Sequence, residues 1–265
     1  MLELEFMKNA LMAGFLVALL CPAVGIFIVL KRYSMIGDTL SHSTFAGVAI
    51  GLVLGYNPLL TAFIYTSLCA IVIEFLRNYY KRYAEMVMSI ILTFSLGIAI
   101  MLVSSGKAPA NINSYLFGSI LTVSKQDLYM ILIVTVICFA IIGTLYNKLI
   151  YVTFDEEGAS TVGIRVKLLN YVFTLMVGAA ISVSIRVMGI LVISSIIVVP
   201  IATALQFKKG FKSSFFISMA VGLIDIMSGL IISYYIDTAP GGTIAVVSVI
   251  VLILSIILSN INKKS

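Results

Sequence analysis

Two side chains that can bind metal ions stand one helical turn apart in an otherwise apolar segment. Asp38 and His42 are four residues apart, and His42 is the only histidine of the chain. Because residues i and i+4 lie on the same face of an α-helix, the carboxylate and the imidazole would stand one above the other. An oxygen and a nitrogen ligand on one face could hold a divalent metal ion. The two groups could instead form a hydrogen bond that ties two helices together, and the residues alone leave both interpretations open.

The segment around this pair, residues 34–55, is apolar enough to cross a bilayer. A charged side chain deep in a membrane helix costs about 2.5–3.5 kcal/mol on insertion scales, so such residues usually face a bundle interior or a pathway. In the same segment Gly47, Gly51 and Gly55 recur at every fourth position, and Thr39 and Ser43 continue the same row of small residues beside the polar pair. This row lies about 100° around the helix from the polar pair and predicts a close contact with another helix.

Two further acidic residues fall inside apolar segments. Asp225 lies near the middle of residues 214–236, where a carboxyl group faces a pathway or a polar partner on a neighbouring helix. It is a weaker candidate for a metal path, with a protonated and hydrogen-bonded structural role as the alternative. Glu74 lies three residues before Arg77 near the end of its segment, and this spacing predicts a local ion pair.

The composition is that of an integral membrane protein. The 265 residues are 61% hydrophobic and 11% charged, with a mean hydropathy of +1.16, whereas charged residues make up about 25% of an ordinary soluble domain. The long apolar runs indicate helices rather than a β-barrel. Three cysteines lie in these runs without paired spacing, which favours small buried side chains over disulfides or a thiolate metal site.

We predict an all-α polytopic membrane protein with eight or nine transmembrane helices, in a single domain of residues 1–265. The apolar runs are each near the ~20 residues that cross a bilayer. The acidic start of the chain and the length of the first run argue against a cleaved signal peptide, so this run counts as a span. The nine runs are residues 10–30, 34–55, 58–76, 85–103, 128–150, 169–185, 188–207, 214–236 and 242–261.

The basic residues indicate which side of the membrane each connection occupies. With the N-terminus outside, 13 of the 17 lysines and arginines fall on the inner side and four on the outer side, which is a positive-inside bias. An odd number of spans then places the C-terminus in the cytoplasm. The inner residues are Lys31, Arg32, Arg77, Lys81, Arg82, Lys148, Arg165, Lys167, Lys208, Lys209, Lys212, Lys263 and Lys264, and the outer ones are Lys8, Lys107, Lys125 and Arg186.

The outer connection at residues 104–127 is longer than a simple turn. In it Pro109 is followed by the moderately apolar sequence SYLFGSIL. This sequence could form a short helix that dips into the membrane or covers an entrance. The alternative is an interfacial loop anchored by Tyr115 and Phe117.

The inner connection at residues 153–170 has the signals of a short helix. Asp155 can cap its first turn, where Glu156 and Glu157 meet the favourable end of the helix dipole. Gly163 can end the helix. A short acidic-fronted helix on the cytoplasmic side could dock a soluble partner or serve as a plain amphipathic connector.

Catalytic and nucleotide-binding motifs are absent from the sequence. There is no GxxxxGK[ST], HExxH or GxSxG, so the chain lacks the usual means of hydrolysing ATP or a peptide or ester bond. Aromatic residues occur without a basic groove, which argues against nucleic-acid binding. We therefore expect a protein that is not itself an enzyme.

Five ordered stretches that extend over nearly the whole chain resemble one known family, the membrane permease subunits of ABC importers for zinc, manganese and related divalent metals. In the first stretch, basic residues, a Gly-Asp step and Ser-His follow one another as in the family. The last departs slightly, because the family often has a second proline where Ala239 stands. The stretches are KRYSMIGDTLSHSTFAGVAIG, SYLFGSILTVS, TFDEEGASTVGI, MGILVISSIIVVPIATA and DTAPGGTIAV.

The resemblance implies a machine with several partners in the cytoplasmic membrane of a prokaryote. The permease would form a homodimer with a translocation path along the subunit interface. Two ATP-binding cassette ATPase subunits would bind below it, and an extracytoplasmic metal-binding protein would deliver the ion above. The cargo would be Zn²⁺ or Mn²⁺, with Fe²⁺ as a further candidate, and no cofactor would be bound permanently.

The resemblance also assigns residues to these roles. Asp38 and His42 match the Asp and His of the family's second-helix motif, which is associated with the ion path. Residues 153–168 match its cytoplasmic coupling helix. The ATPase-docking candidates are therefore Asp155, Glu156, Glu157, Ala159 and Gly163.

Ligation by His42 would make transport depend on pH. The imidazole must be neutral to bind a metal, so uptake should fall as the pH drops well below ~6.5. Two alternatives to this function stay open from the sequence. One is the same machine with an iron complex or another organic cargo, and the other is a secondary transporter or channel that needs no ATPase.

Overall fold

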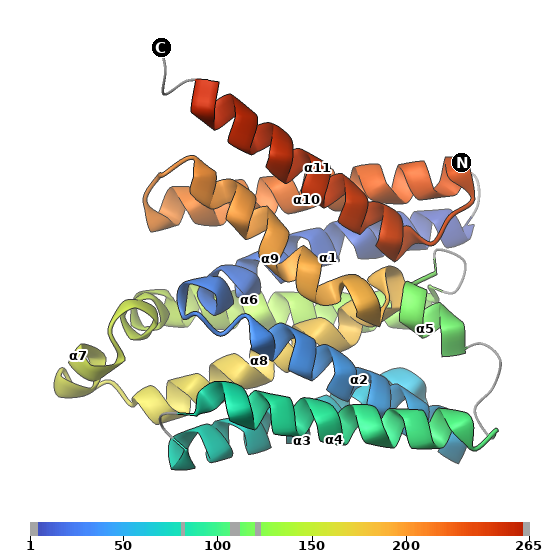
Figure 1. The fold of residues 1–265 in the computed structure, drawn as a ribbon, viewed down its shortest axis with the longest axis horizontal. Coiled ribbons are helices and arrows are strands. Elements are labelled where there is room, and N and C mark those ends of the chain that lie inside the picture. Colours follow the sequence, from blue (N-terminus) through green and yellow to red (C-terminus); the bar gives the residue numbers. More distant parts are fainter. Residues whose placement is uncertain (1–4, 81–82, 107–111, 120–122, 262–265) are drawn as a thin grey trace.

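The computed structural model describes residues 5–80, 83–106, 112–119 and 123–261. Within these ranges the chain is built from α-helices without a β-strand, which confirms the predicted all-α class. Each of nine long helices in this described part occupies the place of one predicted apolar run, and the short helices α5 and α7 lie in the two long connections. Figure 1 shows the long helices running roughly along one direction, with α7 at one end of the bundle and α5 at the other.

The first two helices are joined by a tight turn. Helix α1 comprises Glu5–Leu30 and α2 comprises Met35–Leu54. The amide of Tyr33 donates to the carbonyl of Ile28 at 3.0 Å, which is the long hydrogen bond of a Schellman motif. Arg32 takes the left-handed conformation with φ of 58°, at a cost of about 1–2 kcal/mol for a residue other than glycine. The start of α2 is therefore fixed directly against the end of α1.

Helix α2 packs between α3 (Pro58–Tyr79) and α4 (Ala84–Ser104). Helix α3 begins where the side chain of Asn57 accepts a hydrogen bond from the amide of Leu59 at 3.0 Å. Proline in the first turn fits this start, because its missing N–H would have no partner inside the helix. These three helices form one side of the bundle in Figure 1.

The two long connections each contain a short helix. Helix α5 (Asn113–Phe117) lies in the outer connection, and α7 (Glu156–Thr161) lies between α6 (Lys125–Phe154) and α8 (Val166–Met188). The 30 residues of α6 extend about 45 Å, which exceeds the ~30 Å hydrocarbon core of a bilayer. Helix α6 thus carries α7 beyond the end of the bundle, as Figure 1 shows.

The last three helices complete the bundle on the side of α1. They are α9 (Ile190–Gln206), α10 (Phe211–Ile236) and α11 (Pro240–Ile261). Only Gly189, with φ of 74°, separates α8 from α9. Helix α10 packs against α1 and α11, while α9 also reaches α2.

Seven helices in the described ranges are long and apolar enough to cross a membrane, namely α1, α3, α4, α6, α8, α10 and α11. Helix α9 is shorter, with 17 residues, and α2 carries the polar pair. Figure 1 places the start of α1 and the end of α11 at opposite ends of the bundle, as an odd number of crossings requires. The count of eight or nine spans and the outward N-terminus stay predictions.

Large apolar side chains lie exposed on the outside of the bundle, for example Phe94 and Val136. Such a surface suits a lipid environment rather than water. The cysteines Cys21, Cys69 and Cys138 are free and buried, as predicted for small apolar side chains.

Candidate functional site

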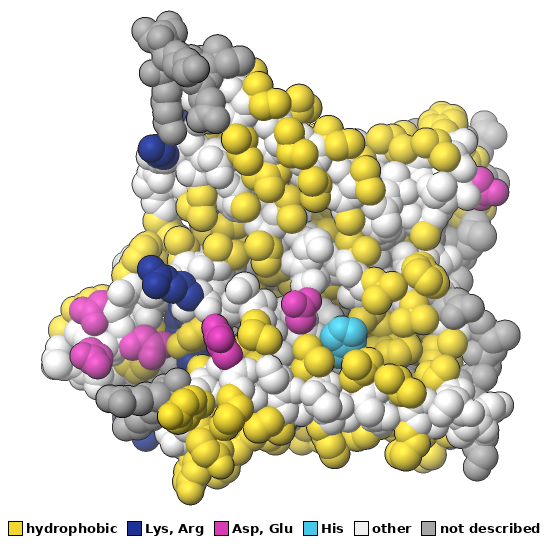
Figure 2. All heavy atoms as spheres, in the orientation of Figure 1, with side chains coloured by type: hydrophobic (Ala, Val, Ile, Leu, Met, Phe, Trp, Pro, Cys, Tyr) yellow, Lys and Arg dark blue, Asp and Glu magenta, His cyan; other side chains and the backbone are white. Residues whose placement is uncertain are grey.

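Asp38 and His42 lie on one face of α2 without contacting each other through a hydrogen bond. Asp38 is exposed and His42 is half-buried. No ion pair within 4.0 Å joins the two side chains, and Nδ1 of His42 is buried without a hydrogen-bond partner in the described part of the chain. The alternative in which an Asp–His hydrogen bond ties two helices together is therefore not what this chain forms. In Figure 2 the histidine, in cyan, lies at the surface beside an acidic side chain in magenta.

A groove of about 290 Å³ between α2 and α9 opens beside Asp38. The two serines that α9 contributes, Ser194 and Ser195, add hydroxyl oxygens to the carboxylate. These two serines were not predicted from the sequence. Their position as adjacent polar residues inside the apolar run of α9 is the signal that could have indicated them. The residues that line the groove are Ser34, Met35, Asp38, Ser194, Ser195, Val198 and Val199.

The ligand set in one chain is small. Carboxylate, imidazole and hydroxyl groups are oxygen and nitrogen ligands that suit divalent transition metals. Among the described residues, no three or more His, Cys, Asp or Glu side chains cluster closely enough to hold a metal ion. One chain thus offers a lined path or a half-site rather than a closed cage.

The opposite faces of α2 are packed tightly against its neighbours. A Cβ atom on Gly47 would lie 2.6 Å from Cα of Ala62 in α3, and one on Gly51 would lie 2.1 Å from Oγ1 of Thr61. These distances confirm the close helix contact that the glycine row predicted. Gly55 has a different role, because its left-handed φ of 73° ends the helix.

Hydroxyl groups hold α2 on both sides. Thr44 shares a hydrogen bond of 2.9 Å with Thr66 of α3, and Ser43 shares one of 3.0 Å with Ser95 of α4. The helix is therefore fixed by α3 and α4, while the face that carries Asp38 remains open to the groove.

Asp225 does not join this site. It is fully buried in α10, and both carboxylate oxygens lack a hydrogen-bond partner in the described part of the chain. Neither Asp225 nor His42 lines the groove beside Asp38, but His42 lies one turn from Asp38 on the same helix. The helix of Asp225 is instead packed on α1, where a Cβ on Gly222 would lie 2.6 Å from Pro22.

The short helix predicted between α6 and α8 forms as the sequence indicated. Oδ1 of Asp155 accepts from the amide of Gly158 at 2.8 Å, and Gly163 has φ of 85°. The amide of Ile164 donates to the carbonyl of Ala159 at 3.0 Å, which completes a Schellman ending. The helix proper is Glu156–Thr161, so the rest of residues 153–168 are turns and helix ends.

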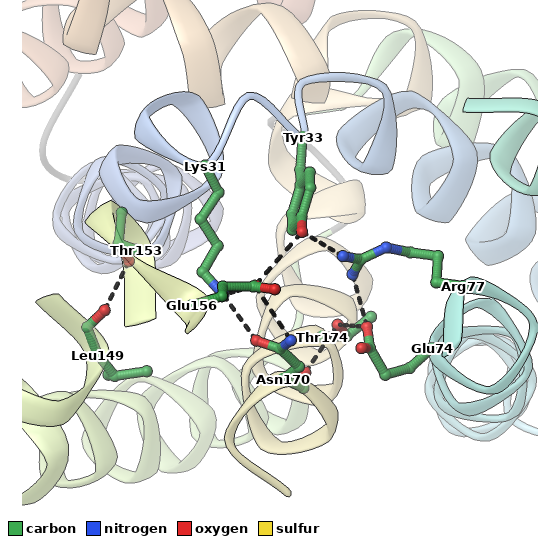
Figure 3. A network of polar contacts seen from close by, with 9 residues as sticks. All are labelled: Lys31, Tyr33, Glu74, Arg77, Leu149, Thr153, Glu156, Asn170 and Thr174. Carbon is green, nitrogen blue, oxygen red and sulfur yellow. Dashed lines mark hydrogen bonds and ion pairs between the residues drawn. The ribbon is translucent and has the colours of Figure 1, made fainter. Parts of the chain in front are cut away.

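The side chains of this segment point in different directions. Asp155, Glu157 and Gly163 are exposed, whereas Ala159 is fully buried. Glu156 turns toward the bundle, as Figure 3 shows. Its Oε1 lies 3.3 Å from Nζ of Lys31 at the end of α1.

A polar network extends from Glu156 into the bundle. Nζ of Lys31 donates to Oδ1 of Asn170 at 2.7 Å, and Nδ2 of Asn170 donates to Oε1 of Glu156 at 3.2 Å. The side chain of Lys31 is only 3% exposed. Burial lowers the pKa of Lys31, and the carboxylate of Glu156 partly offsets this shift.

The network continues to α3 through Tyr33. The Tyr33 hydroxyl lies 3.5 Å from Oε1 of Glu156 and accepts a hydrogen bond from Arg77. The Arg77 guanidinium also lies 4.0 Å from the centre of the Tyr33 ring. Its NH1 pairs with Oε2 of Glu74 at 2.7 Å, which confirms the predicted ion pair. Thr174 of α8 donates to the same Glu74 oxygen at 3.3 Å.

At the opposite end, three of the five quoted stretches meet through glycines. A Cβ on Gly118 would lie 2.6 Å from the carbonyl oxygen of Val187, and one on Gly189 would lie 2.3 Å from the amide nitrogen of Gly118. A Cβ on Gly241 would lie 2.0 Å from the carbonyl oxygen of Met188. Only glycine permits these backbone approaches.

The connection between α4 and α6 forms the short helix α5. Tyr115 is buried, with the Arg186 guanidinium 5.0 Å from its ring centre, while Phe117 is exposed. NH1 of Arg186 lies 3.4 Å from Oδ2 of Asp127. Tyr115 therefore holds α5 on the bundle rather than anchoring a loop in the interface, and Pro109 lies outside the described residues.

The fold is that of a multi-pass membrane protein, and the groove between α2 and α9 is a candidate polar path between its helices. The sequence profile of the ABC 3 transport family matches residues 3–259. The chain therefore belongs to the ABC 3 transport family, and it is a multi-pass protein of the plasma membrane.

Curated relatives match over the full length. A probable metal transport system membrane protein of Treponema pallidum is 44% identical over 99% of this chain and 99% of its own length. The manganese import system permease protein ScaB of Streptococcus parasanguinis is 27% identical, over 99% of this chain and 94% of its length. The high-affinity zinc uptake system membrane protein ZnuB of Haemophilus influenzae is 28% identical, over 95% and 97%.

A solved structure shares the fold. PsaBC from Streptococcus pneumoniae, determined in complex with Fab, superposes with a TM-score of 0.84 and 27% identity. The match covers 95% of this chain and 91% of the matched chain.

Proposed function

We propose that this chain is the permease subunit of an ABC importer that moves a divalent transition metal, Zn²⁺ or Mn²⁺, into the cell. Membership of the ABC 3 transport family supports the assignment to an ABC importer. Relatives named for manganese import and zinc uptake support a metal cargo. Relatives named for iron transport also match, so Fe²⁺ is the third ion to test.

The observation that carries this proposal is the unpartnered pair on α2. Asp38 and His42 keep one face of an otherwise apolar helix polar, and the rest of that helix is held by other contacts. A polar group without a partner in such a place costs stability unless an external ligand or water satisfies it. A passing cation meets that need.

Two ligands per chain suit transport better than storage. A divalent ion bound by two protein ligands is held more weakly than in a closed four-ligand cage, and conduction requires release as well as entry. In a homodimer with the groove at its interface, a second copy would supply a second Asp38–His42 pair. The Asp38 carboxylate would also lower the barrier for a dication by its charge.

The hydrolysis of ATP would take place on partner subunits. In this proposal two ATPase subunits dock at α7, where Asp155 and Glu157 are exposed, and an extracytoplasmic metal-binding protein docks at the α5 end. The groove of about 290 Å³ is lined by a carboxylate and hydroxyls beside apolar side chains. The carboxylate and hydroxyl oxygens of this lining suit a divalent cation.

Uptake of metal by variants tests the proposal. In cells that lack their own permease, competition between Zn²⁺, Mn²⁺ and Fe²⁺ identifies the cargo of the wild-type chain. Asp38→Ala and His42→Ala should each lower uptake by about tenfold or more, since loss of even an outer-shell partner of a metal costs about 10–100-fold in affinity. Glu85→Gln, which removes an exposed carboxylate at the start of α4, is the control.

The result can contradict the proposal in two ways. Uptake at the wild-type level in Asp38→Ala and His42→Ala chains that reach the membrane and assemble would contradict the assignment of the ion path to α2. Full uptake after deletion of residues 155–163 would contradict import driven by an ATPase, because that segment is the proposed ATPase dock. Asp225→Asn should leave the competition between metals unchanged, since Asp225 lies in α10, which packs on α1, α9 and α11.

A further inference from the structure

Glu156 differs from its acidic neighbours in what it contacts. The carboxylate of Asp155 caps α7 by accepting from the amide of Gly158, and Glu157 is exposed. The carboxylate of Glu156 instead accepts from Lys31 and Asn170 through one oxygen. Lys31 is 125 residues away in the chain, so this contact joins α7 to a distant part of the bundle.

Two of the partners of Glu156, Lys31 and Tyr33, belong to the turn between α1 and α2, whereas Asn170 belongs to α8. Lys31 is buried at the end of α1, and its ammonium lies 5.4 Å from the centre of the Phe173 ring. The carbonyl of Tyr33 accepts from the amide of Ile36 at 2.9 Å, so Tyr33 is bonded directly to the first turn of α2. A shift of Tyr33 must therefore move the beginning of the helix that bears Asp38.

The same turn is held from the other side by α3. Arg77 binds the Tyr33 hydroxyl and the buried Glu74, which Thr174 of α8 also contacts. The turn between α1 and α2 thus lies between the Arg77–Glu74 ion pair of α3 and the Glu156 carboxylate of α7, as Figure 3 shows. The side chain of Glu156 is 40% exposed and that of Glu74 is 2% exposed, so the α7 contact is the one placed to loosen and re-form.

We propose that Glu156 is a positioning residue that links α7 to the start of α2 through Lys31 and Tyr33, so that movement of α7 moves Asp38 in the groove. This inference rests on the proposed function, in which α7 is the segment that the ATPase subunits displace. In this proposal Glu156 positions α2, whereas Asp155 and Glu157 face outward and contact the ATPase directly.

The link predicts a loss of coupling rather than a loss of assembly. The test uses the chain assembled with its ATPase subunits in proteoliposomes, with Mn²⁺ and Zn²⁺ as cargo, and measures ATP hydrolysed and metal imported in the same vesicles. Glu156→Gln removes the charge that holds Lys31 and should raise the ATP consumed per imported ion by at least about threefold, within the range of single mutations that alter coupling. The amount of bound ATPase subunit should not change.

Two further variants separate positioning from docking. Glu157→Gln should instead weaken binding of the ATPase subunit, while the complexes that do form keep the wild-type ratio of ATP to metal. Lys148→Met is the neutral control for a Lys31→Met variant, because Lys148 is an exposed lysine of α6 outside the network. Lys31→Met should raise the ratio as Glu156→Gln does.

A charge exchange provides the rescue. In the double variant Lys31→Glu with Glu156→Lys, the amide of Asn170 can turn over so that its oxygen faces the new lysine and its NH₂ faces the new glutamate. The ratio of ATP to metal should then return to within about twofold of the wild type, as expected for two residues that interact directly. Each single exchange should raise the ratio.

The outcomes are distinguishable. Absence of metal uptake by the wild-type complex would overturn the proposed function and this inference with it. Coupled wild-type transport with an unchanged ratio in Glu156→Gln would overturn the inference alone. If Glu156→Gln fails to assemble, the charge exchange decides: a restored ratio supports the link, and an assembled exchange variant with a raised ratio overturns it.

Discussion

Two polar regions in the described part of the bundle differ in whether their charged side chains have partners within the chain. At the α7 end, Lys31, Glu74 and Glu156 each bind at least one oppositely charged or hydrogen-bonding partner within the chain. On the open face of α2, Asp38 is exposed and Nδ1 of His42 has no hydrogen-bond partner in the described part of the chain.

This difference indicates what each region is for. Buried polar groups that satisfy one another hold helices in fixed positions. Polar groups that lack a partner in the chain and lie on an open face of a helix can meet an external ligand. We therefore assign positioning to the network around Glu156 and contact with the ion to Asp38 and His42.

The largest expected effect follows from breaking the buried pair of α3. Arg77→Met leaves Glu74, 2% exposed, without its cation, and loss of one partner of a buried ion pair costs about 3–5 kcal/mol. We expect the free energy of unfolding, measured by titration with a denaturing detergent in mixed micelles, to fall by this amount. Arg32→Met is the matched control, because Arg32 is exposed in the same turn and the new side chain meets the same backbone conformation.

The comparison would fail if the two regions responded alike. Asp38→Asn also removes one charge, but no partner in the chain loses a contact, so its free energy of unfolding should stay within about 0.5 kcal/mol of the wild type. If the free energy of unfolding fell by several kcal/mol in Asp38→Asn, or did not fall in Arg77→Met, the proposed difference between the two regions would be contradicted.

A smaller effect is expected where α2 is held against α3. Gly47→Ala would place its Cβ 2.6 Å from Cα of Ala62, and overpacking of this kind costs about 1–3 kcal/mol. Gly97→Ala in α4 has no atom within 4 Å of the new Cβ and should gain about 0.5–1 kcal/mol from helix propensity. The same detergent titration compares the two variants, and equal stabilities would show that α2 and α3 can separate at little cost.

Local rules predicted much of this molecule. Each apolar run became a helix, Asp155 caps α7, and Gly163 ends it. The ion pair of Glu74 with Arg77 followed from a spacing of three residues. These features depend on neighbours within one or two helical turns, which the sequence displays directly.

Other features depend on packing between distant segments and could not be read in this way. Ser194 reaches the groove only because α9 packs on α2. Glu156 was grouped with outward docking residues, yet it turns inward because Lys31, 125 residues away, arrives beside it. The side to which a residue of a short helix points is set by tertiary contacts, and sequence spacing alone does not encode them.

The most direct test of the central claim is the metal preference of a His42→Asp variant. A residue that touches the ion changes which ion passes, whereas a residue that acts through α2 changes only how fast or how efficiently ions pass. Replacing imidazole by carboxylate should favour Mn²⁺, which prefers oxygen ligands, over Zn²⁺. We predict that the ratio of Mn²⁺ to Zn²⁺ uptake rises by about tenfold or more in His42→Asp and stays at the wild-type value in Glu156→Gln. An importing His42→Asp chain with the wild-type ratio would contradict the assignment of the ion path to this face of α2.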